Sequence, residues 1–410
     1  MGIRCKTYIN KDGLLSYITP NTWLNNQKNT KLRNFILSNT TIETLVDYSQ
    51  VEVFNDATVL TTIAIVSKNE IEKETVIYKP IDGHLIEINK MLQSIWFNNE
   101  YHIMNINLSS KDNELLRKIE TQSYPLESIA KIKFGVKLYE KGKGIPKQES
   151  YFSKDKIYES NIKVDETYRQ YLTGRDIERY RYLWENTWVK YGENLAAPRD
   201  AKLFTGSKIV VRRIVGEKLI ATVIKENYVT SQLLQIVKLE DEKLTNTIMA
   251  ILTSTMMIYF FKKKYNRQEK TFPEIRIYEL GSLPIPNNIK PNKAIDANVE
   301  IMLVLNKTFQ TKKQKFLKRV TDNFELEKLS KKLETFYKSD FKTFLKELKK
   351  KKVTLSLTQQ DEWEEYFESY QKELLELQDQ IDKTDKEIDA MVYELYGLTE
   401  EEIAVVEGNG

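Results

Sequence analysis

The stretch Tyr171–Tyr180 places a glycine, two arginines and two tyrosines within ten residues, between segments with the composition of β-strands. Such a loop presents planar and cationic side chains, and arginine can pair with guanine edges or phosphates through two parallel hydrogen bonds. Gly174 and Asp176 are suited to shaping the turn, so Arg175 is the better candidate to contact DNA. The alternative is an ordinary polar loop without a ligand.

A second candidate segment is rich in lysine and glycine. Four lysines occur between positions 137 and 147 around Gly142 and Gly144, with Glu140 as the one acidic residue among them. Flexible lysines on a glycine-containing loop can follow phosphates without a fixed geometry. We therefore expect this segment to contact a nucleic-acid backbone.

Reading of base edges requires arginine for guanine, or asparagine and glutamine for adenine. Arg212 and Arg213 are neighbours in a predicted strand, Ile209–Ile214, so their side chains point to opposite faces and one of them is expected to reach the DNA. The predicted DNA-contacting residues are Lys137, Lys141, Lys143, Lys147, Arg175, Arg179, Arg212, Arg213, Asn227 and Gln232.

Several kinds of chemistry are excluded by residue type. With Cys5 as the single cysteine and two histidines in 410 residues, we expect no internal disulfide, zinc cluster or histidine-based catalysis. Asp200–Lys202 and Asp241–Lys243 match only the last part of a nuclease metal site, so we assign no metal. The sequence has no apolar signal region and no apolar run near the ~20 residues of a membrane span, so we expect a cytoplasmic protein.

Charge is distributed unevenly along the chain. The segment Asp361–Glu407 holds 17 acidic residues and three lysines, a net charge of −14, which leaves +18 on the remainder because the total is +4. A basic body with an acidic tail favours a polyanionic partner, here double-stranded DNA. Two further basic clusters, at 312–319 and Lys349–Lys352, either border a DNA channel or form solvated helix faces.

The predicted elements fall into an N-terminal α/β part and a C-terminal helical part. Strands are expected at Leu14–Ile18, Ile42–Val46 and Ala57–Val66, with a helix from Asn21 or Thr22 to about Leu37, which makes half of an α/β sheet. Residues 67–123 read as a connector. Tyr124–Val136 opens a new domain, with a glycine suited to positive φ.

The C-terminal part predicts a helical bundle or coiled coil. Nine positions with 3-4 spacing, with one polar exception, form a seam from Phe367 to Leu395. Helices at Ile295–Phe324 and Leu326–Leu348 are available to pack against it in antiparallel fashion.

The N-terminal segment resembles the second half of the catalytic domain of adenine-specific DNA methyltransferases of restriction-modification systems. The resemblance rests on Gly13–Pro20, on Leu32-Arg33 with Phe35, and on Val51–Val59. It implies that Phe54 stacks on the flipped-out target base; the alternative is a core phenylalanine at a strand start.

The earlier motifs of that family are absent from the sequence. There is no Asn/Asp-Pro-Pro-Tyr/Phe tetrapeptide to hold the adenine amine and no Phe-x-Gly-x-Gly loop for S-adenosylmethionine. We therefore assign no catalytic residue and no cofactor to this chain alone. The complete enzyme would use S-adenosylmethionine, with the missing segment or a separate methyltransferase subunit as partner.

From residue 124 onward the chain resembles the TaqI-like C-terminal specificity domain and the target-recognition domains of type I specificity subunits. The matches occur in order at Tyr124–Val136, Leu172–Ile177, Lys208–Ile214, Ile248–Ser254 and Phe272–Pro286. The ending Glu387–Ile403 is similar to the usual terminus of restriction-modification proteins. This resemblance implies sequence-specific DNA recognition.

These features predict an α/β plus α+β fold in three parts. They are a partial Rossmann-like methyltransferase sheet at 1–110, a mixed α/β target-recognition domain at 111–290 and a helical spacer at 291–410. The predicted function is DNA recognition within a site-specific adenine methyltransferase. Two alternatives are a non-catalytic specificity subunit that docks on a separate methyltransferase and a coiled-coil interaction protein without DNA affinity.

Overall fold

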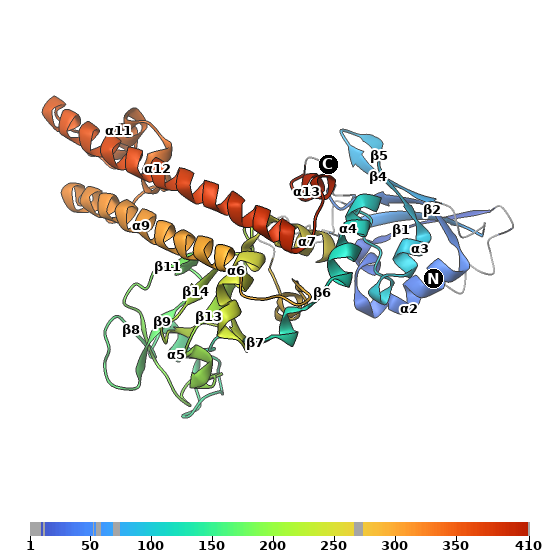
Figure 1. The fold of residues 1–410 in the computed structure, drawn as a ribbon, viewed down its shortest axis with the longest axis horizontal. Coiled ribbons are helices and arrows are strands. Elements are labelled where there is room, and N and C mark those ends of the chain that lie inside the picture. Colours follow the sequence, from blue (N-terminus) through green and yellow to red (C-terminus); the bar gives the residue numbers. More distant parts are fainter. Residues whose placement is uncertain are drawn as a thin grey trace. The chain divides into compact units, whose positions relative to one another are not determined.

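The computed structural model describes residue 10 and residues 13–51, 53–54, 59–68, 74–265 and 274–408. The chain forms two compact units, one made of Met1–Lys118 with Phe260–Arg267 and the other of Ile119–Tyr259 with Gln268–Gly410. The predicted recognition and helical segments thus fall mainly within one unit. Figure 1 shows the elements of each unit.

The first unit is built on a five-stranded sheet of order β1-β3-β2-β4-β5. All neighbours are antiparallel except β2 and β4. The strands are β1 (Leu14–Pro20), β2 (Thr41–Asp47), β3 (Thr61–Ser67), β4 (Glu74–Ile81) and β5 (His84–Leu92). The three predicted strands are present, although β3 begins at Thr61 and the first two residues of its predicted range, 57 and 58, lie outside the described residues. The intervening α-helix, α2 (Thr30–Asn39), begins later than predicted because two short 3-10 turns precede it.

The predicted connector at 67–123 is wrong in its first half, because β4 and β5 form a hairpin there. Asp82 and Gly83 join the strands at φ values of 49° and 81°. Positive φ at both central turn residues matches the twist of an antiparallel pair, and Asp-Gly is a favoured sequence for it. The hairpin extends the sheet, whose core includes the buried side chains of Ile77 and Trp96.

The second unit contains two four-stranded sheets with the orders β14-β13-β16-β7 and β15-β9-β12-β8. All pairs are antiparallel except β15 with β9. A β10-β11 hairpin and a β6-β17 pair accompany them. The strands are β6 (Ser123–Pro125), β7 (Ala130–Phe134), β8 (Glu159–Ser160), β9 (Tyr168–Leu172), β10 (Ile177–Glu178), β11 (Arg181–Tyr182), β12 (Trp188–Lys190), β13 (Lys208–Arg212), β14 (Ala221–Ile224), β15 (Val229–Thr230), β16 (Leu234–Leu239) and β17 (Pro284–Pro286).

Short helices connect or cover the strands, and long helices occupy the C-terminal third. The shorter ones are α3 (Gln93–Phe97), α4 (Ser110–Thr121), α5 (Ser150–Lys154), α6 (Thr245–Thr253), α7 (Thr255–Tyr265), α8 (Ile277–Gly281), α10 (Lys331–Glu334), α11 (Phe341–Lys350) and α13 (Glu400–Val406). The long ones are α9 (Lys293–Phe324) and α12 (Leu357–Leu395). The mixed α/β fold with a long C-terminal helix is therefore confirmed.

Helices α9 and α12 lie side by side and run antiparallel (Figure 1). Asn298 near the start of α9 donates to Glu387 near the end of α12, and Phe324 at the end of α9 contacts Trp363 with ring centroids 4.8 Å apart. Phe367, Leu374, Ile381 and Ile388 of the predicted seam are buried. The single helix predicted at Leu326–Leu348 is wrong: a 3-10 turn at Phe336–Lys338 separates α10 from α11.

No single helix in the described ranges is long and apolar enough to cross a membrane. The segments Glu242–Thr253 and Thr255–Tyr265 pass that test only as a pair, and they meet at a bend of 61°.

Candidate nucleic-acid interface

The turn at 231–233, between β15 and β16, joins segments that were predicted separately to contact DNA. Gln232 N–H donates to the Val136 carbonyl at 2.9 Å, beside Lys137. Arg213 N–H donates to the Leu233 carbonyl at 3.2 Å. The chain thus brings Lys137, Arg213 and Gln232 together although up to 95 residues separate them in the sequence.

Gly135 makes this approach possible. A Cβ at this position would clash with the carbonyl oxygen of Thr230, whose backbone passes directly beside it. Val136 N–H donates to the same carbonyl at 2.7 Å. The sequence-based reason for Gly135, a positive φ, is wrong, because Gly135 is absent from the positive-φ glycines; the close passage of two backbones requires it instead.

The loop carrying Arg175 packs against the same turn. Ser231 N–H donates to the Leu172 carbonyl at 2.9 Å, and a Cβ at Gly174 would lie 3.6 Å from the Leu233 Cβ. The Asp176 carboxylate accepts from Thr173 N–H at 2.5 Å and from its hydroxyl at 2.9 Å, which closes the loop. Arg175 is left exposed.

We call five residues on this turn or on the segments that bond to it the recognition ridge: Lys137, Arg175, Arg213, Gln232 and Leu233. Leu233 is 52% exposed. Lys137 pairs with Glu140 at 2.6 Å and Arg213 with Glu274 at 2.7 Å, in both cases with part of each side chain in solvent. Partly exposed pairs contribute little stability, so these cations can exchange their partners for phosphates at small cost.

We call residues 137–147 the lysine loop. The buried side-chain amide of Gln148 holds this loop in place. This side chain is 1% exposed. Its Nε2 donates to the carbonyls of Leu138 at 2.9 Å and Asn194 at 2.7 Å, and its Oε1 accepts from Glu140 N–H at 2.8 Å. Lys141, Lys143 and Lys147 remain exposed on the loop held in this way.

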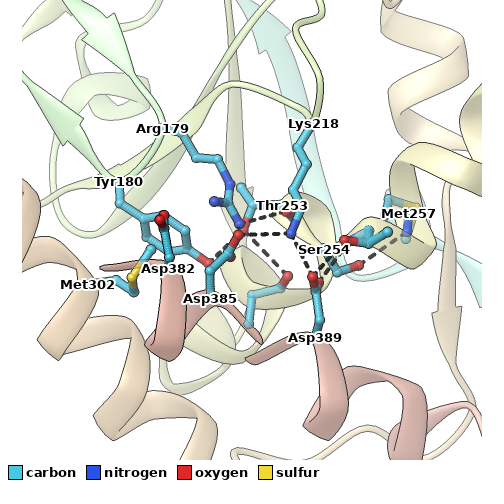
Figure 2. Close-up of polar contacts among 12 residues, drawn as sticks. Arg179, Tyr180, Lys218, Thr253, Ser254, Met257, Met302, Asp382, Asp385 and Asp389 are labelled. Atoms are coloured by element: carbon cyan, nitrogen blue, oxygen red, sulfur yellow. Dashed lines mark hydrogen bonds and ion pairs between the residues drawn. The ribbon is translucent and has the colours of Figure 1, made fainter. Parts of the chain in front are cut away.

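Arg179 lies in a different environment, against the long helix α12 (Figure 2). Its guanidinium forms an ion pair with Asp385, donates to the Thr253 carbonyl at 3.0 Å and lies over the Tyr180 ring at 4.9 Å. These contacts hold the guanidinium within the protein, although its buried Nε has no hydrogen-bond partner among the described residues. We therefore do not carry Arg179 forward as a DNA contact.

We call the ion pairs of Arg179 and Lys218 with Asp385 and Asp389 the helix clamp. Lys218 donates to Asp385 at 3.0 Å and to Asp389 at 2.7 Å, and Asp389 also accepts from Thr255 N–H at 2.8 Å. Burial alone favours the neutral acid, but the hydrogen bonds and charges of Arg179 and Lys218 outweigh it and lower the pKa of Asp385. The clamp fixes α12 to the strand-rich part of the unit.

The remaining predicted contacts lie outside the ridge. Arg212 is half-buried and its guanidinium faces the Ile177 carbonyl at 3.4 Å. Asn227 is exposed in the loop after β14, and the end of β14 pairs with Lys208 at the far end of β13 from Arg212. Arg212 thus lies beside the ridge, with its guanidinium bonded to a backbone carbonyl two residues after Arg175, whereas Asn227 lies at the other end of this strand pair.

Phe54 lies between β2 and β3, next to positions outside the described residues. It is 46% exposed, so the alternative of a core phenylalanine does not describe it here. Val53 beside it is also exposed. An exposed aromatic ring is available for stacking.

The glycine pair Gly142 and Gly144 does not fit a cofactor cradle. Gly144 has a φ of 77°, and a Cβ there would clash with the Asn194 carbonyl, so the protein's own backbone occupies the space beside it. We therefore assign S-adenosylmethionine no site on these residues. Within the described ranges, no three His, Cys, Asp or Glu side chains gather in a group that could hold a metal ion.

Comparison with protein families agrees with the order of these parts. Residues 3–54 match the Eco57I restriction-modification methylase and residues 169–285 match the TaqI-like C-terminal specificity domain. These two segments of the chain are thus similar to parts of restriction-modification proteins. Residues 288–392, which span α9 to α12, match a domain of unknown function, DUF8810. No curated protein matches the sequence.

Solved structures of restriction-modification proteins resemble the chain at low sequence identity. The type IIL enzyme MmeI, solved in complex with DNA, matches 100% of this chain and 50% of its own at 10% identity, with a TM-score of 0.47. The type IIG restriction endonuclease BpuSI matches 95% and 48% at 11% identity, with a TM-score of 0.35. A type I system S subunit from M. genitalium matches 52% and 47% at 14% identity, with a TM-score of 0.25. The chain spans about half the length of each of these chains.

Proposed function

We propose that this chain is the DNA-recognition part of a site-specific adenine methyltransferase of a restriction-modification system. The recognition ridge would contact the base edges and backbone of duplex DNA, and the lysine loop would contact neighbouring phosphates. The residues for methyl transfer would come from outside these 410 residues. S-adenosylmethionine would bind in that other part of the complete enzyme.

One observation carries this proposal: backbone hydrogen bonds bring the segments of Arg175, Arg213 and Lys137 to the turn that holds Gln232, and all but Lys137 lie within the segment that matches a specificity domain. Arginine and glutamine are two of the side chains that distinguish base pairs in the major groove, and lysine provides sequence-independent affinity. An ordinary polar loop gives no reason for separate segments to place such groups together.

Phe54 would serve the target base. Removing adenine from the duplex breaks its stacking, and an exposed aromatic ring can replace part of the lost contact. The exposure of Phe54 supports this role.

Methylome sequencing tests the proposal in cells. A host carrying the full operon is compared with the same host lacking this chain. We expect the modified motif to disappear or change when the chain is removed. An unchanged motif would contradict the specificity role.

A second form of the proposal is a specificity subunit that docks on a separate methyltransferase. Both forms fit a sequence that lacks the catalytic tetrapeptide. The genomic sequence upstream distinguishes the two: an in-frame tetrapeptide supports one longer enzyme, and its absence supports a partner-dependent subunit.

A further inference from the structure

The segment that joins α9 to α12, residues 326–353, carries an unusual excess of positive charge. It holds ten lysines and four acidic residues within 28 positions, a net charge of +6. It comprises α10, the 3-10 turn Phe336–Lys338 and α11. We call this segment the basic cap; it lies within the segment that matches the domain of unknown function.

Half of the acidic residues in the cap are already occupied by the protein itself. Glu347 is buried, accepts from the Ser330 hydroxyl at 2.7 Å and pairs with Lys350 at 2.7 Å. Asp340 caps α11 by accepting from Thr343 N–H at 2.9 Å. Glu347 therefore offsets part of the charge of Lys350 and Lys332, and the excess of positive charge on the cap comes from its other lysines.

Four lysines line a hollow of about 400 Å³ on the cap, together with Thr343 and Glu347. These lysines are Lys332, Lys346, Lys349 and Lys350. Three of these lysines are exposed and form no ion pair with a carboxylate of the described ranges: Lys332, Lys346 and Lys349. Lysines in the last helical turn complement the helix dipole, which accounts for Lys349 and Lys350 of α11 and for Lys332 of the short α10, but not for Lys346.

The cap is a rigid platform. Phe316 of α9 stacks on Phe336 with ring centroids 3.7 Å apart, and Phe344 of α11 and Phe367 of α12 contact the same cluster. All four side chains are at most 2% exposed. The lysines of α11 are thus held on a packed surface.

The chain after α11 has a lysine at a position whose backbone conformation favours glycine. Lys352 has a φ of 63°, the left-handed conformation that usually follows a helix as glycine or asparagine. A lysine there adds charge at a conformational cost of about 1 kcal/mol.

We propose that the basic cap binds the phosphate backbone of duplex DNA outside the recognised sequence. The inference rests on the proposed DNA recognition and adds a second contact, made by the helical part of the chain. Lysines are compact, mobile point charges that suit a repeating polyanion and read no bases. The acidic residues along α12 repel DNA and so confine this contact to the cap.

Fluorescence anisotropy tests the cap with the full chain. One probe is a duplex that carries, between long flanks, the motif that the wild-type chain enriches from a random-sequence pool. The other probe is the same duplex trimmed to that motif. The variant is K332Q/K346Q/K349Q. The control, K372Q/K383Q/K386Q, removes three exposed lysines from α12 and so changes the net charge equally.

We expect the cap variant to lose about tenfold or more in affinity for the long duplex at low salt, with a salt dependence lower by about 2 to 3 in log–log slope. Its affinity for the trimmed duplex and its preferred motif should match those of the wild type, and the control should bind both duplexes as the wild type does. Equal binding of the long duplex by wild type and cap variant would overturn the inference while leaving the recognition role intact. A wild-type chain that binds neither duplex would overturn both.

Discussion

Two glutamines in the second unit differ in burial and therefore in the roles that we assign to them. Gln148 is 1% exposed and uses its whole amide on the backbone groups of Leu138, Glu140 and Asn194. Gln232 is exposed, and its backbone N–H donates to Val136. The first side chain therefore holds a loop, and the second is free to face a ligand.

Gln148→Ala and Gln232→Ala should separate stability from binding. Gln148→Ala leaves buried backbone groups unpaired, so we expect the free energy of unfolding to fall by about 2–4 kcal/mol. Gln232→Ala should change it by no more than about 0.5 kcal/mol and should weaken DNA binding. Denaturant unfolding and DNA titration measure the two effects. Equal destabilisation by both variants would contradict these assignments.

At the residue scale, the sequence indicated the local shape of a loop but not a contact with a distant partner; the DNA-contacting roles stay predictions. Arg175 stood out because Gly174 and Asp176 could shape its loop, and Asp176 does close that loop. Arg179 is a second arginine, four positions after Arg175, but its partner Asp385 is 206 residues away. Neither the spacing nor the composition of the sequence predicts such a pair.

At the scale of elements, the helix clamp determines where α12 lies against the sheets. Arg179 and Lys218 contribute the cations, and Asp385 and Asp389 the carboxylates (Figure 2). The side chains of these four residues are 12–22% exposed, so water screens the pairs only in part. The clamp therefore contributes more than an open surface pair.

Asp385→Asn should weaken the clamp in a pH-dependent manner. At pH 7 we expect the free energy of unfolding to fall by about 1.5–3 kcal/mol, because charged hydrogen bonds to Arg179 and Lys218 are lost. The pKa of Asp385 lies below its ordinary value of 3.8, so its contribution is complete above 3.8 and is lost as the pH falls through the lowered value. The stability gap between wild type and variant should therefore narrow below about pH 4.

The control is Asp382→Asn, one turn earlier on α12, where the exposed carboxylate accepts from Gln378 at 2.8 Å. We expect this variant to unfold with wild-type stability across the same pH range, as measured by chemical denaturation. A gap for Asp385→Asn that stays constant from pH 7 to below pH 4 would contradict the ion-pair explanation.

Elements with a strong periodic pattern were predictable, and those without one were not. The seam of α12 followed from its apolar spacing, and its partner α9 was predicted to within two residues. The hairpin β4-β5 was missed because most side chains of β5 are exposed and leave no apolar stripe. Asp82-Gly83 was the available signal, since this dipeptide favours a two-residue hairpin turn.

On the scale of the whole molecule, the opposite charges of the chain mark its expected DNA-facing parts. The basic body contains the recognition ridge, the lysine loop and the basic cap, and the acidic residues are concentrated in α12 and α13. We assign sequence specificity to the ridge alone. The loop and the cap supply affinity that does not depend on base sequence.

Selection from a random-sequence duplex pool, followed by sequencing of the bound fraction, tests this claim most directly. We expect the wild-type chain to enrich one motif and Arg175→Ala to relax at least one of its positions, at a cost of about 1–3 kcal/mol in discrimination. Arg169→Ala removes an exposed arginine from β9 and should leave the motif unchanged. No enriched motif with the wild type, or the same motif at full strength with Arg175→Ala, would contradict the assignment of specificity to the recognition ridge.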